Sequence, residues 1–171
     1  MKSSDTLHHL KSKIKPLEAL KALRDLWARE GKTVVFTNGV FDLIHRGHVD
    51  YLARARDLGD VLIVGLNSDQ SVQKIKGPQR PIQPHEDRAF ILAAFEFVDY
   101  VTIFEEETPI HVITSLLPDV LVKGGDYTIK TVVGHDIVEE HGGKTVIIPL
   151  VPSKSSTNLI KKIITVYGKP L

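Results

Sequence analysis

A chain of 171 residues, 42% of them hydrophobic, is long enough to bury the core of one domain. Its 22 Lys and Arg residues balance its 21 Asp and Glu residues to a formal net charge of +1, and the basic residues are spread along the chain. This balance disfavours nonspecific binding to nucleic acid or membranes and favours a small-molecule partner. The absence of cysteine excludes a disulfide-built scaffold and thiolate chemistry. No apolar run of membrane-spanning length and no signal-peptide pattern occur, so we expect a cytoplasmic protein.

The N-terminal segment predicts an arm followed by one helix. Residues 1–15 are polar, and we expect a partly ordered arm without a chemical role. Pro16 suits the first position of a helix that Gly31 closes. Apolar residues recur at helical spacing between them: Leu17, Leu20, Leu23 and Trp27. We therefore divide the chain into an N-terminal arm and helix, residues 1–31, and a main domain, residues 32–171.

The next segment changes from a strand pattern to a helix pattern. Residues 33–37 are a buried-strand candidate that ends at Asn38-Gly39, and a helix is predicted from His48. Between them lies His45-Arg46-Gly47-His48, on a turn into a helix N-terminus. Unpaired N–H groups and the helix dipole favour an anion there, and two histidines can donate hydrogen bonds to phosphoryl oxygens. The segment therefore predicts a phosphate site.

Two other interpretations of the histidine pair stay open. The segment could be a simple strand-to-helix turn with His45 and His48 in solvent. The two histidines could also share a metal ion, since residues three apart lie on one face of a helix. The metal interpretation is weaker because the chain lacks cysteine, an H-E-x-x-H motif and a third ligand at a fixed offset.

The middle of the chain predicts a second strand, a long loop and a helix. Residues 61–66 form an almost continuous apolar run, typical of a parallel strand covered on both faces. Residues 67–84 then read as a long basic loop that leaves the carboxyl end of this strand, and loops of this length are usually functional. The helix from Pro84 places Arg88 on an otherwise apolar face, where an arginine needs an anionic partner.

The last third of the chain continues the alternation of strands and helices. Strands are predicted at residues 98–104, 120–122 and 145–150. Helices are predicted from Thr108, as N-cap, through Leu116, over residues 132–141, and from residues 155–157 through Val166. This alternation predicts an α/β fold, a doubly wound parallel sheet of five strands with helices on both faces.

Polar features follow the strands of this sheet, in residues 37–48, 74–88, 123–126 and 155–157. Ligands of such sheets bind outside the carboxyl ends of the strands, where the strand order reverses. These residues therefore describe a nucleotide triphosphate site with a second anionic ligand beside it. Taken singly each feature is ambiguous, because residues 155–157 could be helix caps and Lys123 and Asp126 a surface ion pair. A NAD-type site is disfavoured, since no G-x-G-x-x-G follows the first strand.

The blocks Asn38-Gly39-Val40-Phe41-Asp42 and His45-Arg46-Gly47-His48 resemble the G-x-F-D-x-x-H-x-G-H signature of the cytidylyltransferase-like nucleotidyltransferases. The resemblance covers nearly all of residues 32–164 and is closest to the adenylyltransferases of ADP-heptose synthesis. Further matching stretches are residues 62–69, 76–82, 86–88, 98–101 and 118–127. Val40 departs from the cysteine usual in the family, and Ser155-Ser156-Thr157 departs from the usual Ser-Thr-Thr run. The resemblance implies a Rossmann-like fold.

The resemblance also implies roles for residues at this edge. The two histidines would stabilise the charge that builds on the nucleotide α-phosphate. The catalytic residues would be His45, His48, Lys76 and Arg88. Nucleotide-binding residues would be Thr37, Asn38, Gly39, Val40, Phe41, Gly47, His48, Lys123, Gly124, Asp126, Ser156 and Thr157. Sugar-phosphate-binding residues would be Asp42, Asn67, Lys76, Arg80, Lys123 and Asp126, with no metal held by the protein and Mg²⁺ arriving with ATP.

We therefore expect an enzyme that transfers AMP from ATP to a heptose 1-phosphate, giving ADP-heptose and pyrophosphate for lipopolysaccharide core or other glycan synthesis. The expected partners are ATP and a sugar 1-phosphate, a second copy of the chain, and a separate heptose kinase beside which this stand-alone form acts. Neither nucleic acid nor a membrane is expected as a partner. Two alternatives stay open: a CTP-dependent cytidylyltransferase acting on glycerol phosphate or a related alcohol phosphate, and a non-catalytic nucleotide-binding subunit. No residue selects adenine over cytosine on physical grounds.

Overall fold

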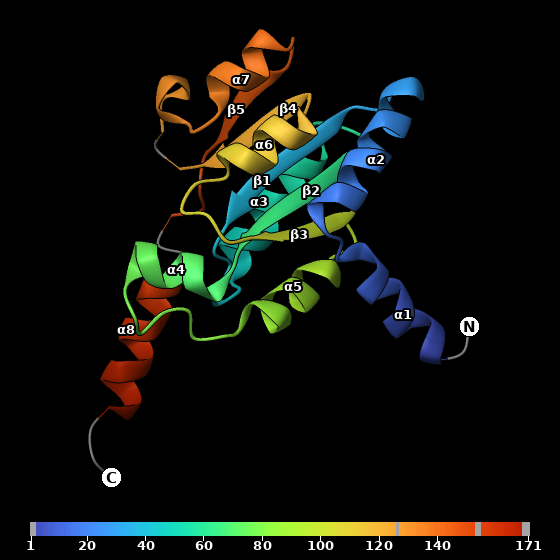
Figure 1. The fold of residues 1–171 in the computed structure, drawn as a ribbon. Helices are drawn as coiled ribbons and strands as arrows, with labels where there is room; N and C mark the ends of the chain where they lie inside the picture. Colours follow the sequence, from blue (N-terminus) through green and yellow to red (C-terminus); the bar gives the residue numbers. More distant parts are fainter. Residues whose placement is uncertain (1–2, 126, 153–154, 169–171) are drawn as a thin grey trace.

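A computed structural model describes residues 3–125, 127–152 and 155–168, and its centre is a five-stranded parallel sheet (Figure 1). The strands are β1 (Val34–Gly39), β2 (Val61–Asn67), β3 (Tyr100–Phe104), β4 (Val120–Gly124) and β5 (Lys144–Ile148), in the order β3-β2-β1-β4-β5. Val35 of β1 pairs with Leu62 of β2 on one side and with Val120 of β4 on the other. The doubly wound parallel sheet is confirmed, and its strand order reverses between β1 and β4.

Helices cover both faces of the sheet because its strands are apolar on both faces. Helices α3 (Arg46–Arg56) and α5 (His85–Ala93) pack in one hydrophobic cluster, which includes Val35. Helices α2 (Leu17–Arg29), α6 (Ile110–Leu116) and α7 (His135–Glu140) pack in the other, which includes Val34 and Phe36. Successive side chains of a strand point to opposite faces, which explains this division along β1.

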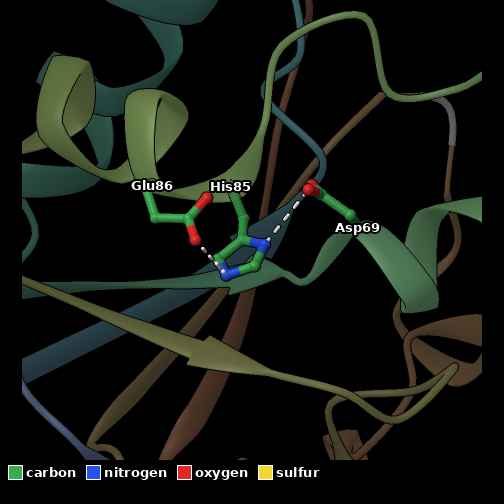
Figure 2. Close-up of side chains that lie close together, drawn as sticks. All are labelled: Asp69, His85 and Glu86. Atoms are coloured by element: carbon green, nitrogen blue, oxygen red, sulfur yellow. Dashed lines mark ion pairs between the residues drawn. The ribbon is translucent and has the colours of Figure 1, made fainter.

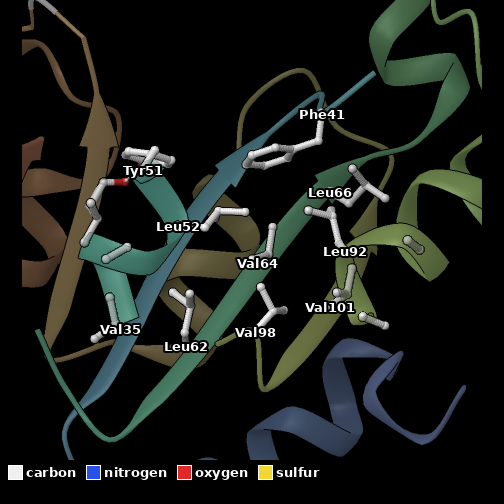
Figure 3. Packing of buried hydrophobic residues seen from close by; sticks show 14 of the residues in the cluster. Val35, Phe41, Tyr51, Leu52, Leu62, Val64, Leu66, Leu92, Val98 and Val101 are labelled. Carbon is white, nitrogen blue, oxygen red and sulfur yellow. Dashed lines mark hydrogen bonds between the residues drawn. The ribbon is translucent and has the colours of Figure 1, made fainter. Parts of the chain in front are cut away.

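The packing on the α3 side fixes the position of the α3 N-terminus. Leu52 of α3 and Leu92 of α5 are fully buried against Leu62, Val64 and Leu66 of β2 (Figure 3). Burial of one such side chain contributes about 1.5–3 kcal/mol, so this cluster holds α3 firmly on the sheet. The start of α3 therefore lies at the carboxyl edge, directly after β1.

Residues 3–13, where a partly ordered arm was expected, form helix α1 (Ser3–Lys13), which extends away from the sheet (Figure 1). The end of α1 is attached by tertiary contacts. Lys13 Nζ donates hydrogen bonds to the Phe95 and Val98 carbonyls at 3.2 and 2.8 Å, and Ile14 forms a parallel bridge with Val101. Burial lowers the pKa of Lys13, against the charges of Asp99 and Glu96, which raise it.

The prediction of one long loop over residues 67–84 was wrong. Residues 69–76 form helix α4 (Asp69–Lys76), for which Ser68 is the N-cap: its hydroxyl accepts a hydrogen bond from the Ser71 N–H at 3.2 Å. Ser71 and Val72 are buried, which anchors the helix on the carboxyl edge. The irregular part of this connection is therefore confined to residues 77–84.

Other elements differ from expectation at their ends. Pro109 occupies the N-cap of α6 without a side-chain hydrogen bond, so the predicted Thr108 cap was wrong. A short 3-10 helix, η1 (Ile129–Thr131), precedes α7. Helix α8 (Ser156–Tyr167) runs away from the sheet, and its side chains, Ile163 and Tyr167 among them, are largely exposed (Figure 1). Within the described residues, no helix combines the length and apolarity needed to cross a bilayer.

Candidate active site

A cavity of about 340 Å³ opens at the carboxyl end of β1, where α3 begins. Its walls come from the loop after β1, the end of α4 and the start of α8. The lining residues are Val40, Phe41, Asp42, His45, Gly47, His48, Lys76, Arg80, Leu150, Ser155, Ser156 and Thr157. Leu150 was not predicted for the site, and Ser155 was predicted only as part of the hydroxyl run 155–157; each of the others was predicted individually. The structure thus brings together residues that lie more than a hundred positions apart in the chain.

The two histidines stand side by side at the start of α3. Their rings stack with centroids 3.9 Å apart, and His45 Nδ1 accepts a hydrogen bond from the Gly47 N–H at 3.1 Å, which makes His45 the N-cap. In neutral His45 the proton is therefore on Nε2, because Nδ1 is an acceptor. His48 Nδ1 is buried and has no hydrogen-bond partner among the described residues. Both rings line the cavity at the positive end of the helix dipole.

Burial, and to a smaller extent the neighbouring His45, together lower the pKa of His48 to about 4. His48 is therefore neutral at pH 7. A neutral imidazole can donate one N–H to a phosphate oxygen and adds no charge to the cavity.

Asp42 and Arg80 lie in this first cavity, bound to each other. Arg80 Nε donates to Asp42 Oδ2 at 2.7 Å, and the Ile82 and Gln83 N–H groups donate to Asp42 Oδ1 at 2.9 and 3.0 Å. Burial alone would raise the pKa of Asp42, but the N–H groups of Gln83 and Ile82, together with Arg80, outweigh it and hold the pKa below its usual value. The Asp42 carboxylate is therefore engaged by donors of the protein itself, and its binding of a sugar stays a prediction.

A second cavity of about 280 Å³ adjoins the first and shares Val40 and Lys76 with it. It lies over the carboxyl ends of β1, β2 and β4, at the point where the strand order reverses. Its lining residues are Asn38, Gly39, Val40, Asn67, Ile75, Lys76, Glu107, Thr108, Pro109, Lys123, Tyr127, Thr131, Val132 and Val133. The exposed end of α4 thus presents one lysine, Lys76, to both cavities.

Lys123 and the two asparagines supply the polar groups on the floor of the second cavity. Lys123 Nζ donates to Asn38 Oδ1 at 3.3 Å and lies 5.8 Å from the centroid of the Tyr127 ring. Burial lowers the pKa of Lys123, and an approaching phosphate would raise it again. Asn67 Nδ2 donates to Ser71 Oγ at 2.9 Å. Such amide and ammonium groups are suited to a phosphorylated, hydroxyl-rich ligand.

Arg88 has no exposed surface and lines neither cavity. Its guanidinium donates to the Val40 carbonyl at 2.6 Å, the Gln83 carbonyl at 2.9 Å and Asp69 Oδ1 at 2.7 Å. The anionic partner that the sequence required is therefore Asp69, at the start of α4. In this arrangement the guanidinium has no access to a phosphate, so its predicted contact with substrate stays untested.

Asp69 is also part of a group of side chains beside α5. His85 Nδ1 lies 3.2 Å from Asp69 Oδ2, and His85 Nε2 lies 3.4 Å from Glu86 Oε1 (Figure 2). The three residues are close enough to surround a cation. Since the Arg88 guanidinium already neutralises the Asp69 carboxylate, the charge at this group favours an ion pair over metal binding.

Three other predicted residues are placed as follows. Thr37 is buried, and its hydroxyl lies 2.6 Å from the Tyr51 hydroxyl, which donates to the Val122 carbonyl at 3.2 Å. Burial raises the pKa of Tyr51, and the bond with Thr37 opposes this. At Gly124, a Cβ atom would lie 2.8 Å from Leu150 and 2.9 Å from Tyr51, so this glycine allows close packing behind the cavities. Asp126 lies outside the described residues.

The three hydroxyls at the start of α8 have different surroundings: one caps the helix, one binds the loop after β1, and one can face a ligand. Ser155 Oγ accepts from the Asn158 N–H at 3.1 Å and is the N-cap, which agrees with the cap interpretation for one of them. Ser156 Oγ donates to the Leu43 carbonyl at 3.0 Å and attaches α8 to the loop after β1. Thr157 lines the first cavity and forms no hydrogen bond within the described residues, so its hydroxyl can face a ligand.

Sequence reasoning missed much of the lining of the second cavity. The missed residues are Ile75, Glu107, Thr108, Pro109, Tyr127, Thr131, Val132 and Val133. Most of them follow β3 or β4, so the same rule about the carboxyl ends of strands could have found them. After β3 the sequence predicted only a helix, and after β4 only Lys123, Gly124 and Asp126 were predicted for the site.

Comparisons with known proteins agree with this geometry. The model of the family described as "Cytidylyltransferase-like" matches residues 36–167. The chain is 54% identical over 156 residues to "Bifunctional protein HldE" of Syntrophotalea carbinolica and 49% identical over 158 residues to the protein of the same name from Geobacter sulfurreducens. These alignments cover 91% and 92% of this chain but 32% of each relative, so the chain spans about a third of their length.

Two solved structures share the fold. The lipopolysaccharide core biosynthesis protein from Thermoplasma volcanium superposes with a TM-score of 0.59 at 25% identity, covering 72% of this chain and 100% of that protein. Pantoate-beta-alanine ligase from Francisella tularensis superposes with a TM-score of 0.58 at 16% identity, over 92% of this chain and 79% of the ligase, which bears on the fold alone. From the match over residues 36–167, the two adjoining cavities and the histidine pair between strand and helix, we conclude that the chain belongs to the cytidylyltransferase-like family.

Proposed function

We propose that the protein is a nucleotidyltransferase that transfers AMP from ATP to a heptose 1-phosphate, giving ADP-heptose and pyrophosphate. One observation carries the proposal: a cavity with two histidines at a helix N-terminus adjoins a second polar cavity, and both share Lys76. Transfer of a group between two anionic substrates needs both of them held next to each other in this way. We assign the first cavity to the nucleotide and the second to the sugar phosphate.

In the proposed reaction, a phosphate oxygen of the sugar 1-phosphate attacks the α-phosphorus of ATP in line. The new P–O bond forms as the bond to the leaving pyrophosphate breaks, and no covalent enzyme intermediate is needed. His45 and His48 would donate N–H groups to the α-phosphate oxygens as charge moves onto the pyrophosphate. Lys76, at the border of the two cavities, would offset the repulsion between the substrates, and Lys123 would bind the sugar phosphate.

Mg²⁺ would enter as part of the nucleotide substrate. Among the described residues that line the first cavity, Asp42 is the sole carboxylate, and it is engaged by Arg80 and two backbone N–H groups. The ion would therefore rest on the triphosphate oxygens, where it neutralises part of their charge.

The choice of a heptose phosphate rests on similarity. The sequence resembles the adenylyltransferases of ADP-heptose synthesis, and the protein from Thermoplasma volcanium is named for lipopolysaccharide core biosynthesis. The amides of Asn38 and Asn67 and the Thr131 hydroxyl at the second cavity suit a ligand with many hydroxyls. A separate heptose kinase acting beside this enzyme, and a homodimer in the cytoplasm, are part of the same proposal.

The proposal is tested by pyrophosphate release from purified protein with Mg²⁺, in a matrix of two nucleotides and two acceptors. We expect turnover with ATP and heptose 1-phosphate, and little with CTP or with glycerol 3-phosphate. Preference for CTP with glycerol 3-phosphate would support the cytidylyltransferase alternative. Nucleotide binding without turnover of any pair would support the non-catalytic subunit.

A further inference from the structure

Phe41 has a backbone conformation that is rare for a large side chain. Its φ is 45°, in the left-handed region, where an aromatic residue is strained. Such a conformation persists only where neighbouring contacts hold it. Phe41 belongs to the first block of the sequence signature and lines the first cavity.

The residues on either side of Phe41 are held by two buried charged groups. Arg88 Nη1 donates to the Val40 carbonyl at 2.6 Å, and the Asp42 carboxylate accepts the Gln83 N–H at 3.0 Å. Arg88 Nε also donates to the Gln83 carbonyl at 2.9 Å, so Asp42 binds the N–H group and Arg88 the carbonyl group of Gln83. Arg88 is fully buried and Asp42 is 2% exposed, so these bonds are shielded from water.

The side chain of Phe41 is thereby directed back over the end of β1 (Figure 3). Its ring meets the His48 ring edge-on, with centroids 5.2 Å apart and an interplanar angle of 60°. A Cβ atom at Gly39 would lie 2.8 Å from the Phe41 ring, so the ring has little room to move on its other side. The His48 ring is consequently enclosed between the Phe41 edge and the stacked His45 ring.

A histidine that donates to a ligand is usually oriented by a hydrogen bond to its other ring nitrogen. His48 lacks this support, because its Nδ1 has no hydrogen-bond partner among the described residues. The orientation of its ring must therefore come from packing, and Phe41 and His45 provide that packing.

We propose that Phe41 is a positioning residue for His48, and that Arg88 and Asp42 influence catalysis through Phe41 by holding its left-handed backbone, and not by touching substrate. This proposal rests on the proposed function, because it takes His48 to be a donor to the α-phosphate. Holding the backbone is a role that a completely buried arginine such as Arg88 can have.

The first test replaces the ring while keeping an apolar side chain, as Phe41→Leu. The matched control is Phe104→Leu, since Phe104 is a similarly buried phenylalanine, 4% against 6% exposed, and lines neither cavity. We expect kcat to fall about 10- to 100-fold in Phe41→Leu with little change in the KM for ATP, because a misplaced donor acts mainly on the transition state. The control should keep its kcat. A purely structural role of Phe41 predicts similar losses in both variants.

A double-mutant cycle with His48→Ala separates positioning from any independent role. If Phe41 acts through His48, the double variant Phe41→Leu/His48→Ala has the kcat of His48→Ala alone. Effects that multiply would overturn the proposal. The same cycle with Arg88→Lys tests the remote part, because replacing an arginine that binds phosphate would raise a substrate KM whether or not His48 is present.

A second readout needs no turnover and therefore stands apart from the proposed reaction. The ring signals of His48 in an NMR spectrum are identified by their loss in His48→Gln. We expect them to shift in Phe41→Leu and in Arg88→Lys, and to stay unchanged in Phe104→Leu. His48 signals that keep their wild-type positions in both site variants would overturn the positioning role, even for a protein whose substrates differ from those proposed.

Discussion

Replacement of Arg88 by methionine should cost the protein a large part of its stability. The change keeps an apolar side chain of similar length but removes the donor of three hydrogen bonds, to the Val40 and Gln83 carbonyls and to Asp69. Each buried carbonyl left without a donor costs about 1–3 kcal/mol, and breaking a buried ion pair costs about 3–5 kcal/mol. Because the Asp69 side chain is 30% exposed, water replaces most of the lost pairing, and the two carbonyls account for the bulk of the loss, about 2–6 kcal/mol. We take the middle of this range, about 3–5 kcal/mol, as the expected total.

The assay is reversible unfolding in urea, followed by circular dichroism, together with thermal melting. For a chain of this size a loss of 1 kcal/mol lowers Tm by about 2–4 °C, so Arg88→Met should melt about 6–20 °C below the wild type. The control is Arg54→Met, which breaks the exposed pair of Arg54 and Asp50 and should cost less than about 1 kcal/mol. Equal effects of the two substitutions would refute the claim that Arg88 is bound within the protein.

Three further predictions concern the first cavity. His48→Ala should lower kcat by about 10²- to 10³-fold, the loss typical of one preorganised donor, with a smaller change in the KM for ATP, as measured by steady-state kinetics. Burial, and to a smaller extent His45, lower the pKa of His48 to about 4 from an ordinary value of 6.5. As the pH falls, His48 is therefore protonated in the unfolded chain before it is protonated in the folded one. The free energy of unfolding therefore keeps its full value above pH 6.5 and decreases as the pH falls toward 4. Urea titrations should show a smaller decrease over this range in His48→Gln. Lys76→Met should raise the KM for both substrates, because Lys76 borders both cavities, whereas Lys74→Met should leave both KM values near those of the wild type.

The sheet and its two faces could be predicted because each strand is a short apolar run bounded by turn residues. Because β1 is apolar on both faces, helices were expected on both faces, and the structure places α2 and α3 on opposite ones. Helices α1 and α4 could not be predicted in this way. The attachment of α1 depends on tertiary contacts, the Lys13 bonds to the Phe95 and Val98 carbonyls, which no local pattern encodes. Helix α4 has a local start signal in the Ser68 N-cap, but its 8 residues are too few to show a clear helical period.

The edge of the sheet at which the site lies could be predicted, but the partners of its charged residues could not. A buried arginine requires an anion, yet the sequence does not indicate that Asp69, 19 residues earlier, supplies it to Arg88. Likewise, Asp42 was expected to face a sugar, and its pairing with Arg80 depends on how residues 77–84 return to the loop after β1. The left-handed backbone of Phe41 follows from these same distant contacts, because local preference alone opposes it.

The fate of the ATP phosphates tests the central claim most directly. Purified protein with Mg²⁺ and heptose 1-phosphate is given ATP labelled with ³²P at either the α or the γ position, and the products are separated by chromatography. Attack at the α-phosphorus between the two cavities predicts that the α label appears in the ADP-sugar and the γ label in pyrophosphate. Transfer of the γ label to the sugar, or release of both labels without a sugar nucleotide, would contradict it.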